Sequence, residues 1–441
     1  MHERNPYKEP PDFAALADFY PPLRSHLRQT PTGCPAIEFK DAAAQRCLTE
    51  ALLQRDFGLS MNLPEGRLCP PVLRLNYVLW IQDIMKATTR SSSAIAGIDI
   101  GTGASAIYPL LGSVIEPSWM FVGTEIDEIS LQSALVNVHD NNLSARIQIL
   151  KANPSDPTLF PIINHPESSY DFTMCNPPFY ESVEEVRRSS DAKTFAPNAV
   201  CTGAEVEMIT AGGESAFVRQ MVDESVTIGS RCRWFTSMLG KLSSVSEVVG
   251  ALRKHGINNY ALTELVQGQT RRWAIGWSFQ DQRLPDDLAR CCSDALQGSL
   301  PLPNTLRQPL PAIRSVQHLQ LSIQAVLAAL EGIIVDVDDA ADTRTSGMSY
   351  HISAFGNTWS RAARRQKKVA FNTDTTENNT GAHGNTVATI DATDNEVDNG
   401  ELSQSQCLWM LECTWTRGRE RALFESFWSH VSRKVGATLT L

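Results

Sequence analysis

The sequence has no long apolar run, no signal peptide and no cysteine pattern typical of a metal site. None of its apolar stretches reaches the roughly 18 residues that span a membrane. Its first residues, MHERNPYKEPPDF, lack the apolar segment of a signal peptide. The ten cysteines include no Cys-x-x-Cys pair or Cys/His cluster at zinc spacing, so we interpret them as reduced thiols. We expect an intracellular protein, nuclear or cytoplasmic, with no membrane segment and no metal.

An excess of positive charge is also absent. The 441 residues include 39 Lys and Arg against 49 Asp and Glu, which gives a net charge of −10. This balance argues against a surface coated in basic charge for nonspecific nucleic-acid binding. It leaves room for a local basic groove, because phosphate binding depends on where the cations lie.

The order of apolar and helical segments predicts an α/β fold. Short apolar segments at 94–101, 120–127, 146–153 and 169–175 alternate with helical patterns. Such alternation indicates a parallel sheet with helices on both faces. Further helices and strands are expected up to residue 280.

We predict four regions along the chain. Residues 1–40, rich in proline and aromatics, form an RNA-binding extension, and 41–280 form the α/β domain. Residues 281–312 read as a linker, and 313–441 as a smaller α+β module of helix, three strands and helix. Within this module the polar, aromatic-free segment 372–405 is expected to be disordered.

A glycine-rich turn, GIDIGTGAS, lies between the first strand of the α/β domain and its helix. It is neither a P-loop nor a complete dinucleotide motif, because no GK[ST] follows and Ala106 stands at the third glycine position. Glu125 ends the next strand, near the spacing that places a carboxylate on ribose hydroxyls. These features suit S-adenosylmethionine, with Asp99, Gly101 and Gly103 around its methionine end. The alternative is a tight turn with a surface acid.

A second motif, MCNPPFY, follows the strand at 169–175. Two acceptors on an adenine N6 amine turn its lone pair toward an electrophilic methyl group, and the Asn176 side chain and the Pro177 carbonyl are suited to this. Pro177 and Pro178 fix the loop in advance. Phe179, with Tyr180 beside it, is placed to stack on a base. The alternative is a proline-rich strand exit with two core aromatics.

At this point the sequence resembles the adenine-N6 RNA methyltransferases of the methyltransferase-like sixteen type. The resemblance rests on FKD, LRLNYVLW, GIDIGTGASAIYPLLG, MCNPPF, GGESAFV, RCRWFTSMLGK, QGQTRRWAIGWSF and the opening RNPYKEPPDF. It covers roughly residues 1–280. The C-terminal part shows no clear match; its pattern is similar to kinase-associated-1-like RNA-binding modules, a likeness of fold alone.

The resemblance implies a class I methyltransferase fold, S-adenosylmethionine as cofactor and a U6-type RNA hairpin as partner. It implies catalysis at residues 176–179 and cofactor contacts at Arg74, Gly101, Glu125 and Asn176. The loop after the motif, at 181–203, departs from the family pattern. A bacterial relative in this family modifies large-subunit ribosomal RNA.

Candidate RNA-binding residues are basic or aromatic and lie outside the two motifs. They are Arg4, Tyr7, Lys8, Lys40, Arg187, Arg188, Arg271 and Arg272. Each single cation also reads as a solvated surface charge, and Tyr7 equally as a staple that holds the N-terminal segment to the core. The basic stretch at 361–368 is a further candidate for RNA or importin binding, with a solvated strand end as its alternative.

Other activities stay open at the level of sequence. Ribosomal RNA, DNA adenine and protein glutamine methyltransferases use the same type of loop, and a non-catalytic protein that binds RNA or senses S-adenosylmethionine is also consistent with the motifs. The long N-terminal segment and the additional C-terminal module favour a structured RNA substrate.

Overall fold

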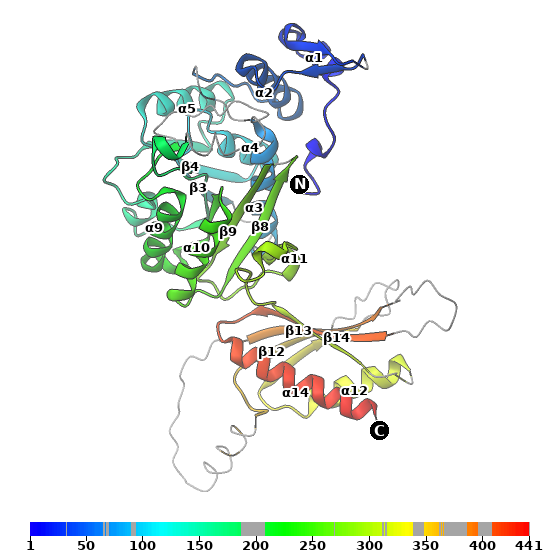
Figure 1. Cartoon of the computed structure of the whole chain (residues 1–441). Coiled ribbons are helices and arrows are strands. Elements are labelled where there is room, and N and C mark those ends of the chain that lie inside the picture. The colour runs from blue at the N-terminus through cyan, green and yellow to red at the C-terminus, as the bar shows by residue number, and fades with distance from the viewer. Residues whose placement is uncertain are drawn as a thin grey trace. The chain divides into compact units, whose positions relative to one another are not determined.

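A computed structural model describes most of the chain, in two compact units (Figure 1). Unit 1 comprises Met1–Gln280 and Leu288–Pro301, and unit 2 comprises Asp281–Asp287 and Leu302–Leu441. The described residues are 1–31, 33–64, 67, 70–89, 94–186, 208–268, 270–310, 313, 315–337, 348–360, 363, 365, 386–395 and 408–440. Among them, no helix combines the length and apolar character needed to cross a bilayer.

The N-terminal segment folds onto the first long helices of unit 1. Its elements are η1 (Pro6–Lys8), α1 (Phe13–Phe19), η2 (Pro21–His26), β1 (Leu27–Gln29) and β2 (Pro35–Ile37), followed by α2 (Ala42–Phe57) and α3 (Pro71–Thr88). Leu16 and Leu23 are fully buried in one cluster with Leu52 of α2 and Leu75 of α3. Residues 1–40 therefore share a core with the helices that follow. They are not a separate extension, and position 40 does not divide two cores.

A seven-stranded sheet forms the centre of unit 1, in the order β5-β4-β3-β6-β7-β9-β8. Its strands are β3 (Ile95–Ile100), β4 (Trp119–Glu125), β5 (Ile147–Lys151), β6 (Tyr170–Cys175), β7 (Cys232–Leu239), β8 (Tyr260–Gln267) and β9 (Thr270–Trp277). Neighbouring strands are parallel from β5 to β7, whereas β9 runs antiparallel to both β7 and β8. The four strands predicted between residues 94 and 175 are confirmed as β3 to β6.

Helices cover both faces of this sheet, as strand β7 illustrates. Phe235 lies in a core cluster with residues of α9 (Gly213–Ile228) and α10 (Leu242–Lys254). On the other face, Thr236 bonds to Tyr77 of α3 and Met238 to Tyr108 of α4 (Ile107–Ile115). The short α6 (Phe160–Ile163) and α5 (Glu128–Asp140) complete the layers. The predicted doubly covered α/β domain is confirmed.

Unit 2 is a five-stranded antiparallel sheet, in the order β10-β14-β13-β12-β11, with helices α12 (Val316–Ala328) and α14 (Arg421–Leu439) packed against it. The predicted three strands correspond to β11 (Ile333–Val337), β12 (Met348–Ala354) and β14 (Leu408–Arg417). The module of helix, strands and helix is thus present, with two strands more than predicted.

Both additional strands correct predictions about linkers and disorder. Strand β13 (Thr386–Asn395) lies inside 372–405, so the prediction of disorder is wrong for these residues. Ala388, Ile390 and Ala392 alternate with polar residues and are buried, a period-two pattern that the polar composition hides. Strand β10 (Thr305–Pro309) lies in the predicted linker and pairs with β14. The linker's 288–301 part belongs to unit 1, where Leu296 and Leu300 join the core.

Candidate active site

The register of the sheet brings the predicted motifs together at the carboxyl ends of its strands. Ile100 of β3 pairs with Thr124 of β4 on one side and with Cys175 of β6 on the other. The residues that come next lie at one level of the sheet: Glu125 is the last residue of β4, and Gly101 and Asn176 directly follow β3 and β6. The glycine turn and the Asn-Pro-Pro-Phe loop, about 75 residues apart in sequence, thus form one site.

The glycine turn has an open backbone. Gly101 and Gly103 adopt φ angles of +67° and +66°, which favour glycine. A Cβ atom added at Gly101 would meet no atom within 4 Å, so the backbone is accessible to a ligand there. The Thr102 amide donates to the Thr124 carbonyl at 2.8 Å and fixes the turn to β4. This arrangement fits a cofactor that lies across the turn.

Asp99 supplies a buried acceptor beneath the turn. Its side chain is fully buried; Oδ2 accepts a hydrogen bond from the Thr102 hydroxyl at 2.7 Å, and Oδ1 has no partner in the described part of the chain. Burial raises the pKa of Asp99 to about 7; the Thr102 hydrogen bond opposes this and the Glu125 charge adds to it. A buried acceptor without a donor fits the cationic methionine end of S-adenosylmethionine.

Glu125 is fixed at the end of β4 by backbone amides. It is buried, and its Oε2 accepts from the Gly103 amide at 2.9 Å. Its Oε1 accepts from the amides of Ile126 and Asp127, each at 2.8 Å. The carboxylate therefore holds the glycine turn against β4. Its predicted bond to the cofactor ribose stays a prediction, as does the cofactor contact of Arg74, half-buried in the first turn of α3.

The Asn-Pro-Pro-Phe loop begins at the end of β6, which hydrogen bonds through Tyr77 hold in place. The Tyr77 hydroxyl accepts from the Cys175 amide at 3.3 Å and lies 2.6 Å from the Thr236 hydroxyl. The next residue, Asn176, is half-buried, and Pro177 is buried. The loop is tied at its far end as well, because the Tyr180 amide donates to the Met208 carbonyl at 2.9 Å. The side-chain oxygen of Asn176 and the carbonyl of Pro177 thus start from a rigid backbone.

Phe179 lies between a basic side chain and a bare stretch of backbone. The Arg272 guanidinium is 5.4 Å from the ring centroid, a cation–π contact. A Cβ added at Gly240 would lie 2.8 Å from Phe179 Cδ1, so the ring packs against the glycine backbone. The predicted residues 176–179 and Arg272 therefore belong to one site.

Sequence reasoning missed the residues that support Phe179. Glu214 of α9 is buried, and its carboxylate accepts from the amides of Gly240 at 2.6 Å and Lys241 at 2.8 Å. Burial raises the pKa of this carboxyl, opposed by hydrogen bonds that include these two amides. The signal was the block GGESAFV, which the resemblance singled out without giving Glu214 a role.

Two of the predicted RNA-binding residues have structural roles in the N-terminal segment. Tyr7 is only 7% exposed and its hydroxyl donates to Asp56 at 2.8 Å. The ring is therefore a staple in the core, which corrects its assignment as an RNA contact. Arg4 is engaged by Asp83 at 2.6 Å and by Gln82 at 2.7 Å, so it fastens the segment to α3.

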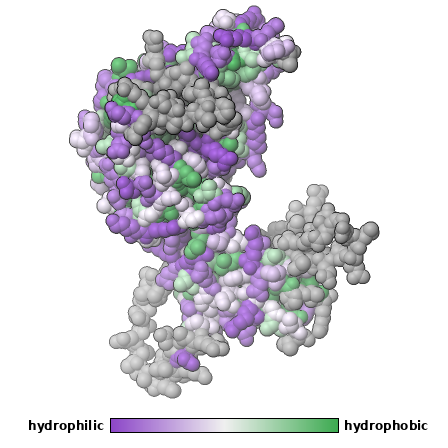
Figure 2. Space-filling view, viewed as in Figure 1, coloured by the Kyte–Doolittle hydropathy of each residue, from purple (hydrophilic) through white to green (hydrophobic). Residues whose placement is uncertain are grey.

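The other predicted RNA-binding residues lie at the surface or outside the described residues. Lys8 and Lys40 are exposed, and Arg271 pairs with Glu264 at 3.1 Å across the β8–β9 hairpin. Arg187 and Arg188 fall outside the described residues. Figure 2 shows hydrophilic side chains over much of the visible face of unit 1, in keeping with its mixed surface charges.

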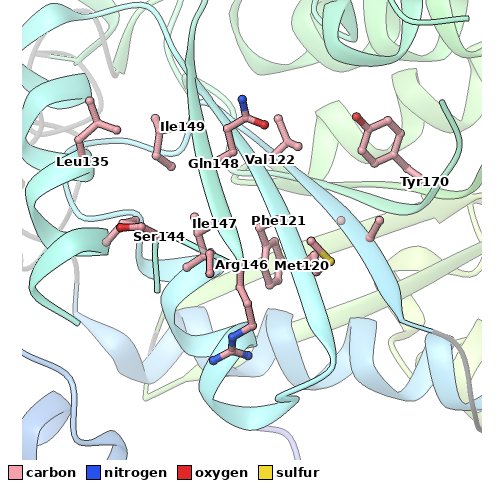
Figure 3. Close-up of a pocket in the computed structure, with 14 residues that line it drawn as sticks. Met120, Phe121, Val122, Leu135, Ser144, Arg146, Ile147, Gln148, Ile149 and Tyr170 are labelled. Carbon is pink, nitrogen blue, oxygen red and sulfur yellow. The ribbon is translucent and has the colours of Figure 1, made fainter. Parts of the chain in front are cut away.

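A hollow in unit 1 lies at the opposite end of the sheet from this site (Figure 3). Its lining comes from the first residues of β3 to β6 and from α5, and is mostly apolar, as with Met120, Phe121, Leu135 and Ile147. Within the described ranges, no group of three or more His, Cys, Asp or Glu is arranged to hold a metal ion.

Comparisons with known proteins agree with this geometry. A family described as "RNA methyltransferase" matches residues 1–281. A U6 small nuclear RNA (adenine-(43)-N(6))-methyltransferase of Schizosaccharomyces pombe is 36% identical over 90% of this chain and 95% of its own length. The similarity therefore extends beyond residue 281, and the expectation that it stops near 280 was wrong.

Vertebrate relatives are RNA N(6)-adenosine-methyltransferases of the METTL16 type. The Danio rerio protein is 38% identical over 83% of this chain and 79% of its own length. The Homo sapiens protein is 42% identical over 64% of this chain, which spans about half, 51%, of that relative's length.

Solved structures show the same fold in unit 1. The human catalytic domain crystallised with the MAT2A 3′UTR hairpin 1 is 41% identical, covers 64% of this chain and 96% of its own, and gives a TM-score of 0.59. The human N-terminal domain in complex with SAH, 40% identical over 64% of this chain and 99% of its own, gives 0.54. Together with the family match over residues 1–281 and the S. pombe relative, this shows that the chain belongs to the family of S-adenosylmethionine-dependent RNA N6-adenosine methyltransferases.

Proposed function

We propose that this chain methylates N6 of an adenosine in a structured RNA, with a U6 small nuclear RNA hairpin as its substrate. The observation that carries the proposal is the common level of the sheet at which Gly101, Glu125 and Asn176 lie. It supports a site in which the glycine turn holds the cofactor beside two acceptors for an amine. The relative from S. pombe, aligned over 90% of this chain, supports U6 RNA as the substrate.

The loop residues act on the adenine amine. Bound S-adenosylmethionine supplies an electrophilic methyl group. The Asn176 side-chain oxygen and the Pro177 carbonyl accept the two N6 hydrogens, which directs the nitrogen lone pair out of conjugation with the ring. Because the strand end and both prolines hold these acceptors in place, little reorganisation is needed when the base enters. The Phe179 ring stacks on the base. No general base has to ionise the amine first.

The cofactor end of the site is formed by Asp99, Glu125 and the glycine turn. Asp99, whose Oδ1 has no hydrogen-bond partner among the described residues, would accept from the cationic methionine end, and the accessible backbone at Gly101 would allow close approach. Glu125, which three backbone amides fix, would bind the ribose.

A direct assay tests the reaction and its acceptor. The full chain is incubated with labelled S-adenosylmethionine and, in separate arms, a U6-type hairpin, a ribosomal RNA hairpin, duplex DNA and a glutamine-containing peptide. We expect methyl transfer to the U6-type hairpin, with N6-methyladenosine found on digestion. Transfer to the DNA or peptide alone would overturn RNA as the acceptor, and hairpin binding without transfer would favour the non-catalytic alternative.

The exposed basic residues of unit 1 are proposed RNA phosphate contacts. Lys8 and Lys40 are exposed, and Arg272 lies at the catalytic loop. Because residues 1–40 share the core of unit 1, deletion of the segment would disturb the fold, so point substitutions are the better test. Lys8→Glu with Lys40→Glu should weaken hairpin binding and make its salt dependence shallower, at unchanged cofactor affinity. Arg219→Glu with Lys254→Glu, at two exposed cations of α9 and α10, makes the same change in net charge and is the control.

Unit 2 is a proposed second RNA contact, through the basic stretch at 361–368. Of its cations only Arg365 lies within the described residues; Arg361, Arg364, Lys367 and Lys368 lie outside them. A tethered second contact raises the local concentration of RNA at the catalytic site. Reversal of these five charges should lower RNA affinity and its salt slope. Unchanged affinity in a folded variant would make unit 2 a structural appendage.

We also propose that the protein acts in the nucleus or the cytoplasm, with the nucleus favoured by a U6-type substrate. Fluorescence microscopy of the tagged chain in its own cells tests this, and an extracellular signal would contradict it.

A further inference from the structure

A buried carboxylate connects helix α9 to the backbone beneath the catalytic loop. Glu214 lies in the first turn of α9 and is only 1% exposed. Its Oε2 accepts from the Gly240 amide at 2.6 Å and its Oε1 from the Lys241 amide at 2.8 Å. These amides come directly after the end of β7 and have no partner in the described part of the sheet. The two carboxylate oxygens of Glu214 therefore accept the hydrogen bonds that these amides donate.

The turn at residues 240 and 241, which Glu214 holds, contacts both aromatic residues of the Asn-Pro-Pro-Phe loop. A Cβ at Gly240 would approach the Phe179 ring to 2.8 Å at Cδ1 and 3.1 Å at Cε1, so this ring rests on bare backbone. The ammonium group of the next residue, Lys241, lies 5.6 Å from the centroid of the Tyr180 ring. The positions of the Phe179 and Tyr180 rings therefore depend on the positions of residues 240 and 241.

The start of α9 also borders the backbone of the loop itself. A Cβ added at Gly213 would lie 3.8 Å from the Phe179 carbonyl oxygen and 3.7 Å from the Glu181 amide nitrogen. The Thr210 amide donates to the Tyr180 carbonyl at 2.9 Å, and the Gly213 amide donates to the Thr210 carbonyl at 2.9 Å. Helix α9, which supplies Glu214, thus contacts the loop at a second point.

We propose that Glu214 is a positioning residue for the methyl transfer. By binding the amides of Gly240 and Lys241 it fixes the backbone at residues 240 and 241, here called the platform, against which the Phe179 ring packs when it stacks on the target adenine. The inference rests on the proposed function, because the platform matters only if a base stacks on Phe179. Glu214 itself touches neither the base nor the cofactor. Its contribution is to hold the ring where the N6 amine of a stacked base reaches Asn176 and Pro177.

The same helix offers a matched control for this carboxylate. Glu224 of α9 also accepts from two consecutive backbone amides, those of Thr158 at 3.0 Å and Leu159 at 2.8 Å. These amides lie at the start of α6 and not in the catalytic loop. Glu214→Gln and Glu224→Gln thus make the same chemical change, the loss of one of two charge-assisted acceptors.

The test measures kcat, the hairpin Kd and the cofactor Kd of both variants and of the wild type. Glu214→Gln should lower kcat by about 10- to 100-fold, because small displacements of a reacting base cost rates of this size. The hairpin Kd and the cofactor Kd of Glu214→Gln should stay within about twofold of the wild-type values. The kcat of Glu224→Gln should also stay within about twofold of the wild-type value. Equal kcat in the two variants would overturn the inference. An inactive wild type would instead contradict the proposed function.

A readout that does not depend on turnover separates positioning from general loss of structure. A hairpin with 2-aminopurine in place of the target adenosine should be quenched on binding to the wild type, because the base stacks on Phe179, and less quenched on Glu214→Gln. If that variant does not fold, Gly240→Ala addresses the platform directly, since its Cβ displaces the ring without removing the carboxylate. Gly250→Ala, where a Cβ meets no atom within 4 Å, is its control. Full quenching and wild-type kcat in Gly240→Ala would overturn the inference.

Discussion

The two ends of the seven-stranded sheet differ in the side chains that gather there. At the carboxyl ends, Glu125, Asp99 and Asn176 lie on or directly after three neighbouring strands, β4, β3 and β6. At the amino ends lies the hollow of Figure 3, lined mostly by apolar side chains such as Phe121 and Ile147. The hollow of Figure 3 thus lies at the end opposite the predicted motifs.

This difference shows that polar groups at strand ends identify the site better than the shape of the surface does. Parallel strands bring their carboxyl ends to one edge, so each loop there adds a side chain to the same place. The amino ends are joined by the returning helices and are free to serve packing. The predictions below therefore compare substitutions at the two ends, beginning with the largest effect on the rate and continuing to cofactor binding, stability and its pH dependence.

The largest effect is expected for Asn176→Ala at the carboxyl end. The change removes one of the two acceptors for the N6 amine, and the loss of one preorganised contact of this kind typically costs about 10²–10³ in rate. Gln148→Ala, at an exposed position on the edge strand β5, should leave the rate unchanged. Single-turnover methyl transfer by folded protein measures both. Near-normal rates for Asn176→Ala would remove the proposed role of this residue.

A smaller effect, on cofactor binding, is expected for Glu125→Ala. The substitution removes a carboxylate that fixes the glycine turn and that we propose binds the ribose, and charge-assisted bonds of this kind contribute about 1.5–3 kcal/mol. The Kd for S-adenosylmethionine should rise by about tenfold or more. Glu128→Ala, an exposed glutamate that pairs with Lys151, is the control. Calorimetry that gives equal Kd values for the two variants would point to a different partner for the ribose.

At the amino end we expect the substitution Gly97→Ala to lower the stability of the protein without lowering its kcat. A Cβ at Gly97 would lie 2.3 Å from the buried Phe172 ring, so Gly97→Ala overpacks the core. The free energy of unfolding should fall by about 1–3 kcal/mol. The kcat of the protein that stays folded should match wild type. A selective loss of kcat at full stability would mean that this end of the sheet contributes to the reaction.

The last comparison concerns the pH dependence of stability through Asp99. Its pKa of about 7 in the folded protein exceeds the ordinary value of 3.8, so between these two pH values the folded state keeps a proton that the unfolded chain has lost. The free energy of unfolding should therefore fall as pH rises through this window and level off above it. Asp99→Asn should flatten the dependence. Denaturant titrations at several pH values measure it, and parallel curves for the two proteins would show that burial does not shift this carboxyl.

Part of the fold could be read from local patterns in the sequence. The strands of the α/β domain are buried on both faces, so they appear as short apolar runs between helical patterns. The glycine turn and the Asn-Pro-Pro-Phe loop were recognisable because their chemistry lies in consecutive residues. Strand β13 escaped prediction because only every second residue, as at Ala388 and Ile390, is buried within a polar segment.

The sequence by itself determined the α/β fold and singled out the glycine turn and the Asn-Pro-Pro-Phe loop as the candidate site. Only the tertiary structure decided that Tyr7 is a staple bonded to Asp56, and that Glu214 holds the backbone under Phe179. The physical reason is the same in both cases. A hydroxyl or a carboxylate near the surface and one in the core look alike in sequence, and they differ only in partners that the fold brings from dozens of residues away.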